Sequence, residues 1–236
     1  MKLLKDEGLV IRKYDYGEAD RIVVVFSKNN GKISGIVKGI RKSKTRESAS
    51  TDILSISDFI FFEKNDKIYI SNSEMKKNFM TITDNSFKTA VIFYVLRCVD
   101  IFIQEKHNSR KIYEITRKML DYIEKEEERE KILISLCYYI LKILKIEGMV
   151  CEIEGEGVYL NINELFFEEN RNECSIKLSE REKKFLLCLN KVDIEGINRL
   201  KFREKEILTI IEIFEKFILL NIDEKLKIKY FFREDF

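Results

Sequence analysis

The sequence has no proline, no tryptophan and only one histidine among its 236 residues. That histidine, His107, lies in the polar stretch KHNSR, and no serine or cysteine nucleophile motif accompanies it, which excludes most His-dependent catalysis. Glycine-rich phosphate-binding patterns of the GxGxxG and P-loop kinds are also missing, so no nucleotide site is indicated. We therefore expect a protein that is not an enzyme and that needs no cofactor.

Long apolar runs are absent as well. No stretch approaches the roughly 20 apolar residues of a membrane span, and the opening MKLLKDEGLV lacks the apolar core of a signal peptide. The cysteines are odd in number, scattered and mostly set in apolar periodic segments, which is typical of reduced thiols: Cys98, Cys137, Cys151, Cys174 and Cys188. These features predict a soluble, cytoplasmic protein that is not exported and contacts no membrane.

The charge is unevenly distributed along the chain. The whole sequence has a formal net charge of +2, but residues 1–50 hold twelve Lys/Arg against six Asp/Glu. A local surplus of this kind indicates a basic surface at the N-terminal end, which favours polyanionic partners.

Glycine is scarce, yet five of the nine glycines fall within the first 39 residues, where tight turns and sheet bends need them. Short β-branched runs lie between them, and NNGK at 29–32 reads as a hairpin turn. A second turn is expected at Asn65 and Asp66. We predict five strands, at 8–14, 21–27, 32–38, 53–63 and 67–71. Five short strands in this space favour an OB-type barrel, with an SH3-like barrel as the alternative.

Beyond residue 80 the apolar period changes to that of helices. Ser179 and Glu182 form a capping box before one of them, and Gly148 is a plausible C-terminal stop for another. We predict helices over about 87–102, 112–123, 129–147, from 180 and over 207–218. The expected fold class is α+β, with a barrel domain at 1–80 and a mostly helical domain at 81–236 that contains an irregular insertion at 149–177.

The segment KGIRKSKTR is the strongest candidate for a binding site. It is expected to form a loop after the third strand, and cations on such a loop can each neutralise a phosphate without reading bases. A solvated basic loop is the alternative interpretation. Arg12 and Lys32, expected on neighbouring strands, would extend the stripe. Tyr14 and Tyr16 could stack bases, although tyrosines at strand ends more often pack at the rim of a barrel. The candidate nucleic-acid-binding residues are Arg12, Lys32, Lys38, Arg41, Lys42, Lys44 and Arg46.

Two other kinds of site receive less support from the residues. A metal-dependent nuclease needs carboxylates placed by strands around a cation, and Asp58 and Glu63 are the nearest candidates. A structural zinc normally takes four thiolate or imidazole ligands, often as CxxC pairs, whereas Cys151 and Cys174 each stand alone.

The N-terminal sequence DEGLVIRKYDYGEADRIVVVFSKNNGKISGIVKGIRKSKTR closely resembles the opening of the bacterial recombination mediator RecO family. The shared pattern is a glycine-led strand, a YGExD turn at 16–20, a GK hairpin at 31–32 and a KG followed by basic residues at 38–42. The match is dense over about 75 residues, and beyond it the correspondence is one of architecture alone.

The resemblance implies an N-terminal OB-fold, a helical domain and no covalent catalysis. It implies binding of single- and double-stranded DNA near the nucleoid, annealing of complementary strands, and work with RecR in loading RecA onto strands covered by single-strand-binding protein, whose C-terminal tail would dock. A protein-interaction adapter with incidental DNA contact is the alternative. Many members carry a four-cysteine zinc module, but Glu154 and Lys177 stand where partners of Cys151 and Cys174 would be, so we predict no metal.

Overall fold

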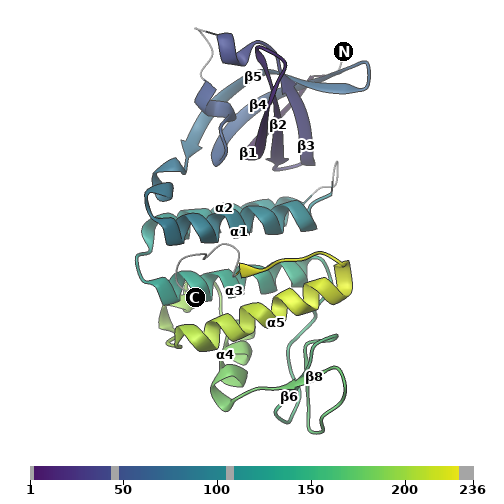
Figure 1. Cartoon of the computed structure of the whole chain (residues 1–236), viewed down its shortest axis with the longest axis vertical. Helices are drawn as coiled ribbons and strands as arrows, with labels where there is room; N and C mark the ends of the chain where they lie inside the picture. The colour runs from purple at the N-terminus through teal and green to yellow at the C-terminus, as the bar shows by residue number, and fades with distance from the viewer. Residues whose placement is uncertain (1–2, 44–47, 105–108, 229–236) are drawn as a thin grey trace. The chain divides into compact units, whose positions relative to one another are not determined.

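The computed structural model describes residues 3–43, 48–104 and 109–228. Its N-terminal part is a closed five-stranded barrel in which the strands follow the order β1-β2-β3-β5-β4 (Figure 1). All neighbouring strands pair antiparallel except β3 and β5, which meet in parallel at Ile36 and Tyr69. The strands are β1 (Leu3–Tyr16), β2 (Asp20–Ser27), β3 (Gly31–Val37), β4 (Ser55–Lys64) and β5 (Lys67–Asn78).

Side chains along β3 alternate between the core of the barrel and its outer face. Ile33 and Val37 point into the core, while Lys32, Ser34 and Ile36 lie on the outer face, as a period of two requires. Branched and aromatic side chains from all five strands fill the interior, so burial of apolar area stabilises the closed form. The core residues are Val10, Val23, Val25, Ile33, Val37, Ile40, Phe59, Phe61 and Ile70.

The two predicted hairpin turns are present. Gly31 has a φ of 66° at the end of the turn between β2 and β3. Between β4 and β5, Asn65 and Asp66 have φ values of 51° and 56°, the left-handed conformations that a tight two-residue hairpin needs and that Asn and Asp tolerate.

Helices follow the barrel, which confirms the predicted α+β fold class (Figure 1). The capping box is formed as expected, because the Ser179 hydroxyl accepts from the Glu182 N–H and the Glu182 carboxylate accepts from the Ser179 N–H at 2.8 Å. Gly148 follows the third helix at a φ of 70°. The α-helices are α1 (Ser86–Phe102), α2 (Arg110–Lys125), α3 (Arg129–Ile146), α4 (Glu180–Lys191) and α5 (Glu204–Ile222). Short 3-10 turns occur at Ile40–Lys42, Ser48–Thr51, Met80–Asp84 and Gly196–Arg199.

Within the irregular segment 149–177, the stretch GVYLNINELFF is extended or a hairpin by its sequence, and the structure forms a hairpin there. The segment contains a three-stranded sheet in the order β7-β6-β8, made of β6 (Tyr159–Asn161), β7 (Phe166–Glu168) and β8 (Ser175–Lys177). Strands of three residues are too short to show a period in sequence, so the third strand could not be predicted. Buried Leu160 and Phe167 give this small sheet an apolar core.

The chain divides into two units. The first comprises 1–86 and 99–117, and the second comprises 87–98 and 118–236, so that α1 and α2 each contribute to both. The second unit is organised around α3, whose residues 132–141 are all buried. Within the ranges that the structure describes, no helix combines the length and apolar character needed to cross a membrane.

Candidate nucleic-acid interface

The basic loop begins at a fixed point on the barrel. Asp20, the first residue of β2, accepts a hydrogen bond from the Gly39 N–H at 2.8 Å through Oδ1 and pairs with the Lys38 ammonium at 2.6 Å through Oδ2. The Lys38 ammonium lowers the pKa of Asp20, and the Asp20 carboxylate in turn raises the pKa of Lys38. Gly39 has a φ of 65°, which a residue with a side chain adopts only with strain.

The next two cations lie in the 3-10 turn Ile40–Lys42 and face the connection between β1 and β2. The Arg41 guanidinium donates to the Gly17 carbonyl at 3.1 Å and lies 3.4 Å from the Asp15 carboxylate. The Lys42 ammonium is 3.1 Å from the Glu18 carboxylate. The structure therefore gathers Lys38, Arg41 and Lys42 at one end of the barrel, as expected, whereas Lys44 and Arg46 lie outside the described residues.

The chain that follows the basic loop is also fastened to β2. Arg21, whose side chain is 13% exposed, donates to the Thr51 hydroxyl and the Asp52 carboxylate, each at 3.1 Å. Consecutive residues of one strand thus hold the start of the basic loop, through Asp20, and the segment at 51–52, through Arg21.

Arg12 and Lys32 form a separate group. They lie on β1 and β3, which β2 separates, so they are not on neighbouring strands. Both pair with Asp100 near the C-terminus of α1, at 3.0 Å and 2.9 Å, and Lys32 also donates to the Asp100 carbonyl at 2.9 Å. A cation is favourable at that end of a helix, and Lys32 is only 15% exposed, so its charge is committed to the fold. Arg12 remains 44% exposed.

The structure adds a groove that sequence reasoning missed. It has a volume of about 380 Å³ and lies along β3, bordered by Ile22 of β2, by the end of β1 and by the turn between β4 and β5 with the start of β5. OB-folds bind oligonucleotides on this strand face and these two loops. Tyr16, half exposed, was the one residue in the groove that the sequence marked for stacking. The lining residues are Tyr16, Ile22, Lys32, Ile33, Ser34, Ile36, Glu63, Asp66, Lys67 and Ile68.

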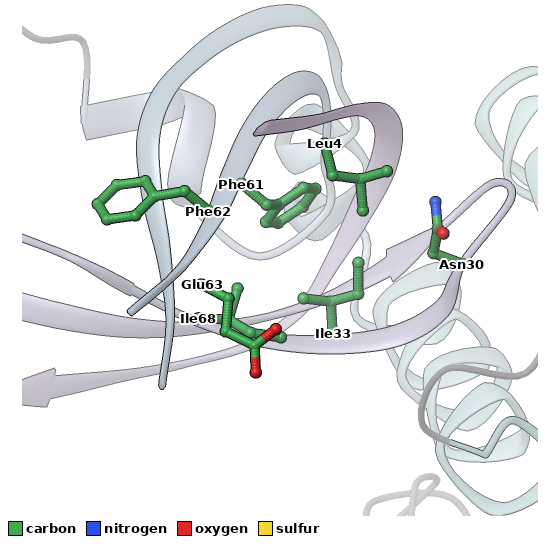
Figure 2. Close-up of a pocket in the computed structure, with 7 residues that line it drawn as sticks. All are labelled: Leu4, Asn30, Ile33, Phe61, Phe62, Glu63 and Ile68. Atoms are coloured by element: carbon green, nitrogen blue, oxygen red, sulfur yellow. The ribbon is translucent and has the colours of Figure 1, made fainter. Parts of the chain in front are cut away.

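A second hollow, of about 430 Å³, shares Ile33, Glu63 and Ile68 with the groove. Its lining is mostly apolar and is completed by Leu4, Asn30, Phe61 and Phe62, with Glu63 as the charged member (Figure 2). Among the described residues, none of the seven that line this hollow is a cation that could offset Glu63, whereas the groove has Lys32 and Lys67 beside Glu63 and Asp66. The hollow therefore suits a protein side chain better than a DNA backbone.

The two candidate nuclease carboxylates lie apart from each other in different surroundings, one paired with a lysine and one lining the hollows. Asp58 lies 2.8 Å from the Lys76 ammonium, which also binds Glu7 at 2.8 Å. Glu63 lines the two hollows.

Cys151 and Cys174 are exposed and reduced. In the described part of the chain, no three His, Cys, Asp or Glu side chains are grouped so that they could hold a metal ion.

Comparison with known proteins points to one family. Residues 1–79 match the family model described as "Recombination protein O N terminal". A curated protein of Alkaliphilus metalliredigens named "DNA repair protein RecO" is 30% identical over 148 residues, which cover 62% of this chain and 59% of that protein. Proteins of the same name from Caldanaerobacter subterraneus and Oceanobacillus iheyensis are 26% and 25% identical to this chain. The alignments cover 85% of each of those two proteins.

Proposed function

Because the chain belongs to the RecO family, we propose that it is a DNA-binding mediator of recombinational repair that holds strands by their backbones and anneals complementary ones. The observation that carries this proposal is the gathering of Lys38, Arg41 and Lys42 at one end of a closed barrel, on a loop whose start is fastened by Asp20. A fixed set of cations can hold phosphates while the bases stay free to pair. Little sequence preference is expected.

The groove beside this loop supports the same proposal. Tyr16 lines the groove, is half exposed, and pairs across the ladder with Asp20, the residue that holds Lys38. Base–aromatic stacking next to backbone cations is the common way of binding single strands without sequence readout. Arg12 belongs to the proposed site as an exposed flanking position and Lys44 and Arg46 as further contacts on the same loop, whereas Lys32 lines the groove with its charge already held by Asp100.

The partners are part of the proposal. We expect the chain to act together with RecR and to contact the C-terminal tail of single-strand-binding protein. RecA would be loaded as an indirect result, in the cytoplasm at the nucleoid. The apolar hollow of Figure 2 does not fit the acidic tail, because its rim carries Glu63 where a lysine or arginine would be needed.

The test compares two triple variants in binding to a labelled single strand across a range of salt. In Lys38→Gln/Arg41→Gln/Lys42→Gln, we expect weaker binding and a salt slope shallower by about 2, since each phosphate contact on a single strand contributes about 0.7. The matched control, Lys201→Gln/Lys205→Gln/Lys216→Gln, removes the same charge from exposed positions of the second unit.

Equal slopes for the loop variant and the wild type would remove the loop from the site. The same proteins are then assayed for annealing of complementary strands, with and without single-strand-binding protein and RecR. Incubation with Mg²⁺ or Mn²⁺ checks the nuclease alternative, which requires cleavage that Asp58→Asn abolishes.

A second candidate function, that of a protein-interaction adapter, is favoured by the apolar hollow of Figure 2. Leu3 and Leu4 at the start of β1 are 61% and 36% exposed, so apolar surface continues at its edge. An adapter would retain its part in the reaction with RecR and single-strand-binding protein after the loop cations are neutralised, whereas a DNA-binding mediator would lose it.

A further inference from the structure

The cations of the basic loop already face carboxylates of the same chain. Three acidic residues lie on or beside the connection between β1 and β2, and each pairs with one described loop cation. Asp15 lies 3.4 Å from Arg41, Glu18 lies 3.1 Å from Lys42, and Asp20 lies 2.6 Å from Lys38. A phosphate that binds one of these cations must therefore either displace the paired carboxylate or lie next to it.

The three acidic residues differ in burial and in what else they hold. The Asp20 side chain is 19% exposed, and it binds the Gly39 N–H as well as Lys38. Glu18 is 91% exposed, and Asp15 is 57% exposed and also lies 3.7 Å from the Arg21 guanidinium. Asp20 therefore belongs to the fold of the loop, while Glu18 and Asp15 make solvent-exposed contacts that open readily.

We infer that this acidic connection is a working part of the DNA site: Asp20 positions the loop, and Asp15 and Glu18 compete with phosphate for its cations. The inference rests on the proposed function. The competing carboxylates must be displaced when a strand binds, and they then remain close to its phosphates, so they weaken binding and hasten release. A protein that anneals strands needs such release, because it must let go of the paired product.

The test exploits one chemical change, carboxylate to amide, at three positions of the same connection. Asp15→Asn and Glu18→Gln are each expected to tighten binding to a labelled single strand roughly threefold, within the range of exposed ion pairs. Their salt slopes should steepen, because phosphate binding no longer breaks an internal ion pair. Asp20→Asn removes the same charge but is expected to weaken binding, because the start of the loop loses its attachment.

Two controls separate charge from position. Glu173→Gln removes a carboxylate from an exposed site in the second unit and should leave affinity unchanged. Asp20→Glu keeps the charge and changes only the reach of the carboxylate, so it should also weaken binding and should expose the loop to tryptic cleavage at Lys42. This variant also serves if Asp20→Asn does not fold.

The outcomes are distinct. Equal tightening in all three amide variants would mean that net charge alone acts and would overturn the positioning role of Asp20. Unchanged affinity in Asp15→Asn and Glu18→Gln would overturn the competition. If Lys38→Gln/Arg41→Gln/Lys42→Gln binds as well as the wild type, the proposed function of the loop fails first, and this inference fails with it.

Discussion

Asp6 is a buried carboxylate on β1 whose partners beyond its own strand are neutral donors from one hairpin. It accepts hydrogen bonds from the Ser27 hydroxyl, from the Asn29 N–H and amide at 3.0 Å and 2.7 Å, and from the Asn30 amide at 2.7 Å. The letters NNGK predict that a turn occurs here. Asp6 explains why the turn is held in one conformation, and nothing local in the sequence indicates it, since its partners are more than twenty residues away.

Tyr94 shows how one buried side chain is linked to the chain that follows the last helix. Its hydroxyl donates to Glu215 at 2.9 Å, and the same carboxylate oxygen accepts the Ile228 N–H at 2.6 Å. Burial raises the pKa of Tyr94 well above its ordinary value, and burial likewise raises the pKa values of Cys98 and Cys137. These groups stay protonated in the folded state at pH values where the unfolded chain has released the protons.

The predicted consequence is a loss of stability at alkaline pH. The contribution of Tyr94 is complete below the unfolded pKa of about 10 and is lost as pH rises above it, because only the unfolded state then releases the proton. Tyr94→Phe should make the decline in the free energy of unfolding shallower above about pH 10, at a cost near 1 kcal/mol at neutral pH for the missing hydrogen bond. Urea unfolding from pH 8 to 11 measures both, with Tyr14→Phe as an exposed control. An unchanged decline would contradict the role of Tyr94.

At the scale of elements, β1 shows how closely neighbouring strands of the barrel pack. It pairs with β2 and with β4, and at Gly8 it pairs with both, opposite Ser27 and Ser57. A Cβ at Gly8 would lie 2.2 Å from Cγ1 of Val25, which is fully buried. The glycine is needed here for close packing rather than for an unusual φ.

Gly8→Ala should therefore destabilise the barrel by about 1–3 kcal/mol, the usual cost of overpacking a filled core. Gly39→Ala is the matched comparison, because a Cβ there meets nothing within 4 Å and only the positive φ is strained, at about 1 kcal/mol. The midpoints of urea unfolding rank the two variants. A Gly8→Ala protein as stable as the wild type would mean that β1 can shift away from β2.

At the scale of the whole molecule, residues 149–177, which stand where a zinc module would be, are held by contacts that involve no metal. Lys183 of α4 donates to the Gly157 carbonyl at 2.5 Å and lies 4.6 Å above the Phe167 ring. Asn190 donates to Glu152 at 2.5 Å. These bonds connect the small sheet and the chain before it to α4 and give it partners that do not require a metal.

The purified protein is therefore predicted to contain no stoichiometric zinc, and a chelator should leave its thermal unfolding unchanged. Atomic emission on the protein measures the metal content, and Cys151→Ser/Cys174→Ser should match the wild type in stability because both side chains are exposed. Zinc at one atom per chain, lost in the double variant, would show that the two cysteines keep a metal-binding role.

Local sequence determined the elements of this protein. Side chains that alternate or recur every three to four residues record which face is buried, so the five strands, the long helices and the hairpin turns could be predicted from neighbouring letters. The cluster of loop cations was visible for the same reason, because Lys38, Arg41 and Lys42 are adjacent in sequence.

Only the tertiary structure decided what those cations face. Lys38 and Asp20 are eighteen residues apart, and Lys32 and Asp100 are sixty-eight apart, with no periodic signal to join them. Pairing of β2 with β3 brings Lys38 to Asp20, the C-terminal end of α1 brings Asp100 to Lys32, and the closed barrel forms the groove along β3. The sequence could indicate a basic loop, but the fold determines that Asp20 holds the loop in place and that Asp15 and Glu18 pair with its cations.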